Sequence, residues 1–580
     1  KSHEAFYRKP LRIGSAALTL ALVTSMAPSF TASGLDRAMA AQPAQTAPSF
    51  APMANEPAQD QIIDADMIAS GRVKKAANLT DAHGVGKGLI SGHVYLTTPG
   101  GNPGASYDNG NVKMDGITVY AQFRDKDGSY SPIFSAKTHT LPDVVGGNGG
   151  KGTFAFGTGN KGITWTDKFG KEHTWAARTD QKHRIWVEPF TNKRGNRVEM
   201  FRQANGFVPG SFNGLVEAPL GSFGVADANI GLMAAFLQEA APSHENSYMV
   251  ARDETGAAKI EHDSNGFIDG QNPWNSVSGR VWLETGGLDK GIVATGPSKN
   301  TADPAADGYT VYASTLTKDG AAANQKLHEQ YKNDPDKLAE ATKKMLEDHP
   351  EYILKTVSGT TDAEGRYTLR FNDGQTATQQ STDNLNVDHM FLWVENKDGV
   401  VQHGYTGFHT PVFQRFTAGG NFRPSAVPAP NVLTPDISRN RIYNVNYALM
   451  PYSPVSITAD YNAIDKPAAP GTTVTPEFKG DLSDLPSKIE WRDKNGKVVK
   501  TCDLDQSKSV KAQVAACTFD IPADAKKGDI FNVVVVSGGN DVAAWSVLVT
   551  DKNPDADIYE PAYEGKLVVP GKETKSTPTF

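Results

Sequence analysis

The stretch "SGHVYLTTPGG" at residues 91–101 returns as "SGRVWLETGG" at residues 278–287. In both stretches apolar and polar residues alternate, aromatic and β-branched residues are frequent, and glycine closes the segment. This pattern is typical of a half-buried β-strand bounded by turns. A strand that occurs twice with the same surroundings predicts two copies of one β module in the chain.

Three further pairs of segments follow in the same order. They are "DGITVYAQFRDKDG" (115–128) with "DGYTVYASTLTKDG" (307–320), "GTFAF" (152–156) with "GRYTLRF" (365–371), and "RIWVEPFTNKRG" (184–195) with "FLWVENKDG" (391–399). Four matches at offsets of roughly 190 to 210 residues indicate a tandem duplication. We therefore expect one β-sandwich module at 86–275 and its repeat at 276–452, with Trp186 and Trp393 in matching core positions.

The second module carries an insertion that the first lacks. In residues 324–352, Leu338, Met345 and Leu346 recur at helical spacing, with a start signal at Asp334-Pro335 and a stop signal at His349-Pro350. This predicts a helix set into a β module. Such a helix either covers an open end of the sandwich or presents a binding surface.

A third module is expected at 453–552. Short alternating strands around an Asn-Gly turn, over about a hundred residues, suit an immunoglobulin-like sandwich. The chain has only two cysteines, Cys502 and Cys517, and both lie in this module. In an exported protein such a pair predicts a disulfide, which would contribute ~3 kcal/mol, and the alternative is two buried free thiols.

The composition fits a turn-rich protein of mainly β class. The 580 residues include 55 Gly and 35 Pro, and the formal net charge is −7. An acidic chain without a basic patch argues against nucleic acid as a partner. The expected fold class is mainly β, made of tandem β-sandwich modules with one helical insertion.

The first forty residues predict export. Basic residues precede an uncharged stretch from Ile13 to Phe30, and the small residues Ala38 and Ala40 form a cleavage site, so residues 1–40 read as a signal peptide. A transmembrane anchor is the alternative, but the strongly apolar part is shorter than the ~20 residues that a span requires. Residues 41–85 begin with a segment rich in Ala, Pro and Gln, and we expect a disordered leader there.

The C-terminal stretch 553–580 carries the clearest family signal. Its "DADIYEPAYEGKLVVPGK" places motif residues at Asp557, Tyr559, Pro561, Tyr563, Pro570 and Gly571. This resembles the beginning of the Rib/alpha-like repeat of Gram-positive, corynebacterial-like surface proteins. The resemblance implies a fragment that stops inside its first repeat, and a stalk attached to peptidoglycan by a missing C-terminal anchor.

Two further resemblances agree with this one. The segment "FYRKPLRIGSAAL" (6–18) resembles the signal peptides of wall-anchored proteins. "SGRVWLE" followed by "TTDAEGRYTLRF" (360–371) resembles the prealbumin-like stalk domains of Gram-positive adhesins. In such families Lys and Asn can form intramolecular isopeptide bonds, but the sequence singles out no such pair.

No catalytic motif is present, so the sequence predicts no enzyme, no catalytic residue and no cofactor. The acidic turns "DKDG" (125–128) and "DSNG" (263–266) offer oxygen ligands for Ca²⁺, although both are explained as β-turns.

Taken together, these features predict a secreted, cell-wall-anchored adhesin. Its repeated modules would form a head that binds a host surface glycan or extracellular-matrix protein, with the third module and the Rib-like repeats as stalk. One alternative is an exported carbohydrate-active enzyme, which would need two carboxylates about 5 to 10 Å apart. The other is a purely structural stalk.

Overall fold

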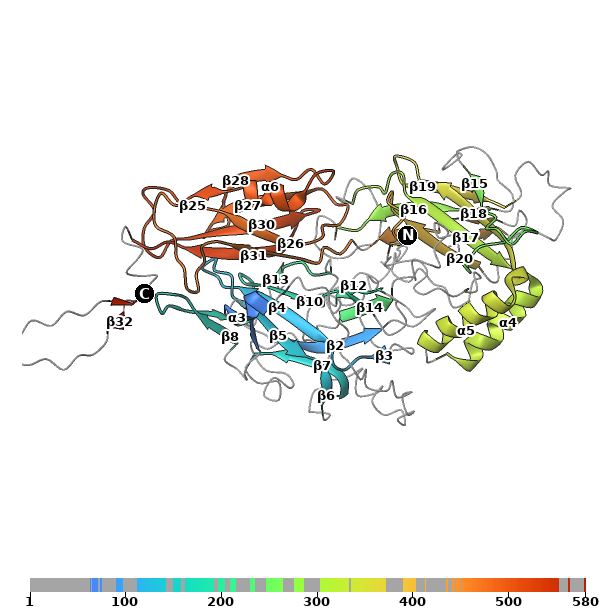
Figure 1. Cartoon of the computed structure of the whole chain (residues 1–580), viewed down its shortest axis with the longest axis horizontal. Coiled ribbons are helices and arrows are strands. Elements are labelled where there is room, and N and C mark those ends of the chain that lie inside the picture. The colour runs from blue at the N-terminus through green and yellow to red at the C-terminus, as the bar shows by residue number, and fades with distance from the viewer. Residues whose placement is uncertain are drawn as a thin grey trace, which may run out of the picture.

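The computed structural model places most of the chain in three β modules (Figure 1). The structure describes residues 63, 65–70, 73–75, 90–96, 112–141, 150–157, 162–191, 197–203, 209–214, 230–234, 247–263, 276–285, 303–332, 335–371, 390–402, 413, 434–436, 441–443, 445–449, 451–551, 562–563 and 578–579. Within these residues strands greatly outnumber helices, so the predicted mainly β class with tandem modules is confirmed.

The first repeat consists of two sheets around one core. The first sheet has the order β1 (Val73–Lys75), β5 (Ile133–Lys137), β4 (Thr118–Arg124), β10 (Lys182–Trp186), β13 (Asn213–Gly214). The second has the order β11 (Phe190–Thr191), β12 (Arg197–Gln203), β14 (Ile230–Ala234), β2 (Ile90–Leu96), β7 (Gly150–Phe156), β6 (His139–Leu141), with β3 (Val112–Lys113) paired to β2. A separate hairpin joins β8 (Ile163–Thr166) to β9 (Glu172–Trp175), and α3 (Ala65–Ala69) precedes β1.

The second repeat keeps the central strands of both sheets but has fewer strands in each. Its first sheet has the order β15 (Glu261–Asp263), β18 (Ile353–Thr360), β17 (Thr310–Leu316), β20 (Met390–Glu395). Its second has the order β19 (Arg366–Arg370), β16 (Ser276–Leu283), β22 (Arg441–Tyr443), β21 (Thr434–Asp436), with β23 (Tyr447–Leu449) paired to β16.

The correspondence extends to strand direction. The pairs β1–β5 and β15–β18 are both parallel, as are β14–β2 and β22–β16. The quoted strands therefore occupy the same place in each repeat, β2 in the first and β16 in the second.

Both repeats begin earlier than the sequence predicted. Ile63, Met67 and Val73 are buried in the core of the first repeat, so residues 63–75 belong to this module and not to a disordered leader. Likewise Met249 is buried in the core of the second repeat, and β15 pairs with β18. The boundaries at 86 and 276 are wrong because the first strand of each repeat is only three residues long and carries no visible alternation.

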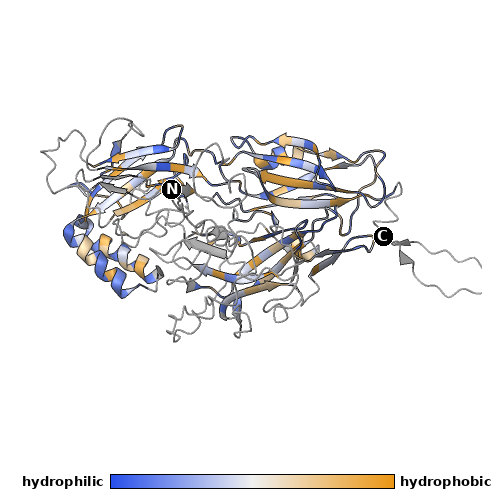
Figure 2. Cartoon of the chain, turned by 180° about the vertical axis from the view of Figure 1, so that it is seen from behind, coloured by the Kyte–Doolittle hydropathy of each residue, from blue (hydrophilic) through white to orange (hydrophobic). Residues whose placement is uncertain are grey.

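The helical insertion is present as two helices rather than one. They are α4 (Lys318–Gln330) and α5 (Pro335–Asp348), and the 3-10 turn η3 (Pro350–Tyr352) follows. Leu338 and Leu346 are buried, and Met345 packs against the core of the second repeat. Both helices show hydrophilic and hydrophobic bands in Figure 2, as expected for helices that cover a sheet with one face.

The third module contains the predicted disulfide, Cys502–Cys517. Its larger sheet has the order β28 (Val498–Asp503), β27 (Ser487–Asp493), β30 (Ile530–Ser537), β31 (Asn540–Leu548). The pairs β24 (Val455–Ala459) with β26 (Pro476–Gly480) and β25 (Thr473–Val474) with β29 (Phe519–Asp520) complete it, together with the helix α6 (Val510–Ala516).

The third module packs along the side of the first repeat instead of following it end to end (Figure 1). Every residue of β30 is buried. Val533 and Val535 belong to the core of the third module, whereas Val534 and Val536 contact Tyr130 and other residues of the first repeat. The third module therefore packs side by side with the first repeat, which differs from the arrangement expected of a stalk.

The same module also contacts the second repeat. Asn540 Nδ2 donates to Thr285 O at 2.8 Å, and Tyr309 Oη donates to Asp484 Oδ2 at 2.5 Å. Leu485 is buried among the core residues of the second repeat. The third module thus joins both repeats.

Several predicted features fall outside the described residues. The cleavage site at Ala38 and Ala40 is among them, as is the Rib-like motif except for Tyr563. Tyr563 lies in β32 (Ala562–Tyr563), which pairs with β33 (Pro578–Thr579). None of the helices in the described part of the chain has the length and hydrophobicity needed to cross a bilayer.

Candidate functional site

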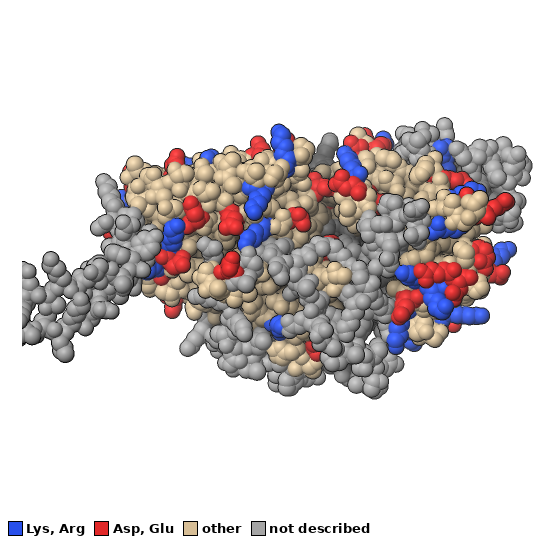
Figure 3. Space-filling view, in the orientation of Figure 1, with Lys and Arg blue, Asp and Glu red and all other residues tan. Residues whose placement is uncertain are grey.

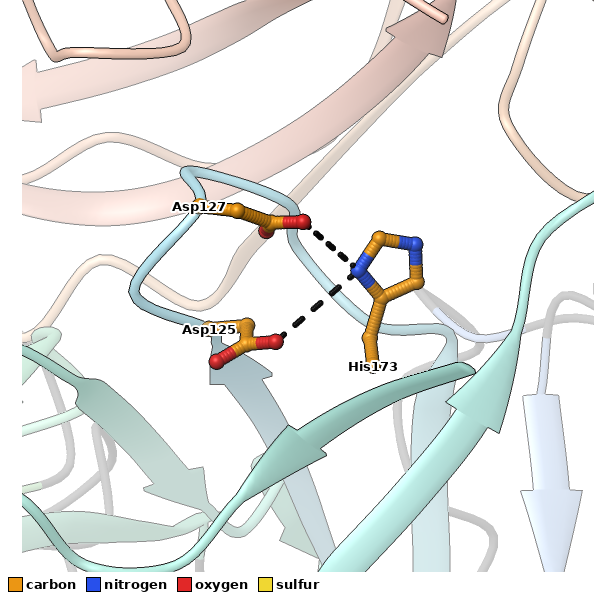
Figure 4. A group of neighbouring side chains, drawn as sticks. All are labelled: Asp125, Asp127 and His173. Carbon is orange, nitrogen blue, oxygen red and sulfur yellow. Dashed lines mark ion pairs between the residues drawn. The ribbon is translucent and has the colours of Figure 1, made fainter. Parts of the chain in front are cut away.

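Asp125, Asp127 and His173 gather where the turn after β4 meets the β8–β9 hairpin (Figure 4), and a third aspartate, Asp167, lies beside the same histidine. Asp125 and Asp127 lie in the turn between β4 and β5, and the N–H of Gly128 closes that turn on Asp125 O at 3.0 Å. Gly128 has φ +90°, a left-handed conformation that favours glycine.

The hairpin β8–β9 supplies the other two residues. Asp167 follows β8, and its Oδ1 accepts the backbone N–H groups of Phe169 and Lys171 at 2.9 and 3.0 Å. This local capping fixes the turn. His173 lies in β9 opposite Trp165, whose indole ring stacks on the imidazole.

His173 is buried, with carboxylates near both ring nitrogens. Its Nε2 lies 3.1 Å from Asp167 Oδ2. Its Nδ1 lies 3.0 Å from Asp127 Oδ2 and 3.9 Å from Asp125 Oδ2. Nevertheless Nδ1 makes no hydrogen bond of suitable geometry with any described residue.

The surrounding carboxylates are held by other donors. Asp125 Oδ1 accepts from Gln181 Nε2 at 3.0 Å, and its Oδ2 accepts from the N–H of Thr174 at 3.2 Å. Asp127 Oδ2 lies 2.7 Å from Lys171 Nζ, whose side chain is 59% exposed. The aspartates are therefore pre-positioned around the imidazole.

The imidazole of His173 and the carboxylates around it each favour the charged form of the other. Burial alone would lower the pKa of His173, but the carboxylates of Asp127 and Asp167 overcome it and raise this pKa. The pKa of Asp127 is lowered: burial would raise it, and the contacts with His173 and Lys171 outweigh that effect. The carboxylates thus favour a positive charge at this position, which either a proton on the imidazole or a bound cation supplies.

The sequence pointed to only part of this cluster. The turn 125–128 forms as a β-turn, and Asp125, Asp127 and His173 each offer a ligand atom, all within 4.8 Å of one another. His173 and Asp167 were not predicted, because no spacing signal connects them with a turn so far away in sequence. In the other acidic turn, Asp263 ends β15 and residues 264–266 lie outside the described residues.

A second set of residues recurs in both repeats. Tyr120 stacks on Trp186 with ring centroids 5.6 Å apart, and Tyr312 stacks on Trp393 at 5.2 Å. Both tryptophans are buried, which confirms the predicted core role. Glu395 is buried two residues after Trp393, and desolvation raises its pKa to about 7.

The contact between the third module and the first repeat is rich in charge. Within the third module Arg492 makes a bidentate pair with Asp541, both bonds 2.8 Å long, and Lys182 Nζ of the first repeat lies 3.6 Å from the same carboxylate. Arg184 is buried, lies 3.9 Å from the Trp186 ring, and donates to Val455 O at 3.0 Å.

No family model and no curated protein matches this chain. Among solved structures, it superposes on an extending-region tetra-tandem repeat of a large adhesion protein with TM-score 0.14, at 10% identity, over 80% of this chain and 99% of that one. The BSP domain of a biofilm-associated protein gives TM-score 0.12 at 10% identity, over 81% and 82%. Native α-2-macroglobulin from Escherichia coli, domains NIE–MG1, gives 0.11 at 10% identity, over 48% and 99%. At these TM-scores none of the superpositions establishes a common fold.

Proposed function

We propose that the chain is the head of a secreted bacterial adhesin that binds a host surface glycan or an extracellular-matrix protein. The observation that carries this proposal is the architecture: a duplicated β module whose two copies contact one disulfide-bonded module. A disulfide persists in an oxidising, extracellular compartment, in agreement with the predicted signal peptide.

The face that would meet the ligand lies away from the third module. Helices α4 and α5 project at one end of the molecule, and the third module packs along the opposite part (Figure 1). Acidic and basic side chains gather over these helices (Figure 3), among them the pairs Lys343–Glu347 and Lys344–Asp348. A mixed-charge, solvated surface on a rigid support suits a polar partner.

The remaining parts of the proposal concern attachment. The residues from 553 onward would begin a Rib-like stalk, and peptidoglycan would hold the protein through an anchor beyond it. The stalk would act as a spacer that keeps the head away from the cell wall.

The test is a binding screen with the whole chain. The protein is applied to glycan and extracellular-matrix arrays, and in parallel to generic glycosidase and protease substrates. We expect saturable binding to one ligand class without turnover. Turnover without saturable binding would contradict the adhesin proposal and favour an exported carbohydrate-active enzyme.

A matched pair of variants localises the surface. Lys326→Glu with Lys344→Glu reverses charge on α4 and α5, where both side chains are exposed. Lys497→Glu with Lys508→Glu makes the same charge change on exposed residues of the third module. We expect the first pair to weaken binding at least tenfold and the second to leave it unchanged.

A further inference from the structure

The His173 cluster has a feature that its role as a turn contact does not explain. The Nδ1 atom of this buried imidazole has no hydrogen-bond partner among the described residues, yet it faces Asp125 and Asp127 (Figure 4). Buried polar atoms are nearly always satisfied by a partner. An unsatisfied nitrogen aimed at two carboxylates therefore indicates a place for a cation.

The other ring nitrogen fixes the tautomer that such a cation needs. With a proton on Nε2, His173 donates to Asp167 Oδ2 at 3.1 Å. The lone pair of neutral imidazole then lies on Nδ1, on the side of Asp125 and Asp127. A carboxylate that orients a metal-binding histidine in this way is a regular part of metal centres in proteins.

We propose that His173, Asp125 and Asp127 bind a divalent transition-metal ion of the zinc class, with Asp167 orienting the imidazole. Ligand bonds of about 2.0–2.2 Å at tetrahedral angles place ligand atoms about 3.4 Å apart. The distances from Nδ1 to the two aspartates, 3.0 and 3.9 Å, lie on either side of that value. Small side-chain rotations would make them equal, and water would complete the coordination.

The donor set discriminates between metals. Imidazole suits zinc and its neighbours, whereas Ca²⁺ takes six to eight oxygen ligands at about 2.3–2.6 Å. The cluster supplies one nitrogen and two carboxylates, with other carboxylate oxygens already bound to Gln181 and Thr174. The turn at 125–128 thus fits a transition metal better than the Ca²⁺ that its sequence suggests.

Lys171 would compete with the metal. Its Nζ lies 2.7 Å from Asp127 Oδ2, the oxygen that also faces His173 Nδ1. Since 59% of this side chain is exposed, the ammonium group can move into solvent when a dication arrives. Removing this charge should therefore tighten metal binding.

Metal binding would also strengthen the contact with the third module. The turn at 125–128 accepts a hydrogen bond from Asn532 Nδ2 at Gly128 O, 2.9 Å away. The tip of the β8–β9 hairpin donates from the N–H of Lys168 to Ala463 O at 2.9 Å. A metal that links these two turns stabilises the folded state by mass action.

The experiment uses the full chain without an affinity tag. Protein stripped with EDTA is titrated with ZnCl₂ by calorimetry, bound zinc is counted after gel filtration, and the melting temperature is measured with Zn²⁺ and with Ca²⁺. We expect one zinc per chain and a rise in Tm of several degrees with Zn²⁺ alone. Failure to retain stoichiometric zinc would overturn the proposal.

Four variants separate this site from adventitious binding. His173→Ala and the nearly isosteric Asp127→Asn should each weaken zinc affinity at least tenfold, and the second keeps the shape of the turn. Lys171→Gln should tighten it several-fold. The control is His349→Ala, which removes an exposed histidine 2.9 Å from Glu351 and should change nothing. Equal affinity in wild type and Asp127→Asn would contradict the assignment.

Discussion

The two repeats share the central strands of both sheets but use the same local sequence differently. In the first, Lys126-Asp127-Gly128 forms a tight turn between β4 and β5. In the second, Lys318-Asp319-Gly320 starts α4, and Thr317 caps the helix by accepting the N–H of Gly320 at 3.1 Å. The duplication therefore preserved the sheets and left the connection between two strands free to change.

The difference follows from what each connection contacts. A Cβ on Gly128 would lie 2.1 Å from Lys494 O of the third module, and a Cβ on Gly320 would lie 2.8 Å from Tyr352 Cβ. The first turn is short because the third module lies against it. At Gly320 the nearest atoms belong to Tyr352 of the same repeat, and this second connection contains two helices.

The largest expected effect comes from the paired tryptophans. Trp186→Ala and Trp393→Ala should each cost about 3–5 kcal/mol of unfolding free energy, because each removes a large buried ring. Denaturant unfolding measures the cost. Only Trp186→Ala should also speed proteolysis of the third module, because Arg184 joins this ring to Val455. If both variants speed proteolysis of the third module equally, the first repeat does not contact that module through Trp186 in the way described.

Next in size are two carboxylates of the third module, one beside each repeat. Asp541→Ala should cost about 3 kcal/mol, since it leaves Arg492 of the same module without its bidentate partner in a mostly buried setting and also removes the ion pair with Lys182 of the first repeat. Asp484→Ala removes a single bond from Tyr309 and should cost about 1–2 kcal/mol. Thermal unfolding of both variants gives the order, and a larger loss from Asp484→Ala would contradict the larger contribution expected from the Asp541 carboxylate.

One buried group in each repeat, His183 in the first and Glu395 in the second, should make opposite contributions to the pH dependence of stability. In the second, the pKa of Glu395 is about 7 when folded against 4.5 in the unfolded chain, because burial disfavours its charge. The folded state then holds more protons between these values, so this group's stabilisation falls as pH rises, by up to about 1.4 kcal/mol per pH unit.

In the first repeat the sign is reversed. Burial lowers the pKa of His183 to about 4 from 6.5, so its contribution is lost as pH falls through that interval. Because the two intervals overlap between about pH 4.5 and 6.5, the two contributions oppose each other there. Glu395→Gln removes the opposing contribution, so the free energy of unfolding of this variant should rise more steeply with pH than that of the wild type. Chemical denaturation between pH 4 and 8 measures the difference, and an unaltered pH dependence would show that Glu395 does not titrate there.

The smallest expected effect concerns Thr317, at the position where the first repeat forms a turn and the second begins α4. Thr317→Ala removes the cap of α4 and should cost about 1 kcal/mol. Thr317 matches Asp125 of the first repeat, so Thr317→Asp introduces the aspartate that the first repeat has at this position. Aspartate caps helices well, so the free energy of unfolding should stay within a few tenths of a kcal/mol. Circular dichroism during thermal melting compares them, and equal losses would mean that the side-chain cap contributes nothing.

The sequence predicted the parts of the fold that depend on local pattern. Repeated blocks such as 91–101 and 278–287 located β2 and β16, and the spacing of Leu338 and Leu346 located α5. It missed the start of α4 because Lys318-Asp319-Gly320 reads as a turn, as its counterpart does in the first repeat.

The packing of the third module was not predicted, although one signal existed. Val533–Val536 is an uninterrupted apolar run, which is typical of a strand buried on both faces rather than one. For the cluster around His173 the sequence signalled only the acidic turn at 125–128. Asp125 lies in that turn and His173 in β9, and only the folded arrangement brings them together.

The most direct test of the central claim, that the third module packs side by side with the first repeat, is hydrogen exchange at three amides. Tyr130 donates to Ser546 Oγ at 2.8 Å, and Phe212 and Lys168 donate to the carbonyls of Asp541 and Ala463 at 2.7 and 2.9 Å. None of these bonds exists unless the modules pack side by side. We expect exchange as slow as at strand amides of β30, whereas exchange at the rate of exposed loops would contradict the account.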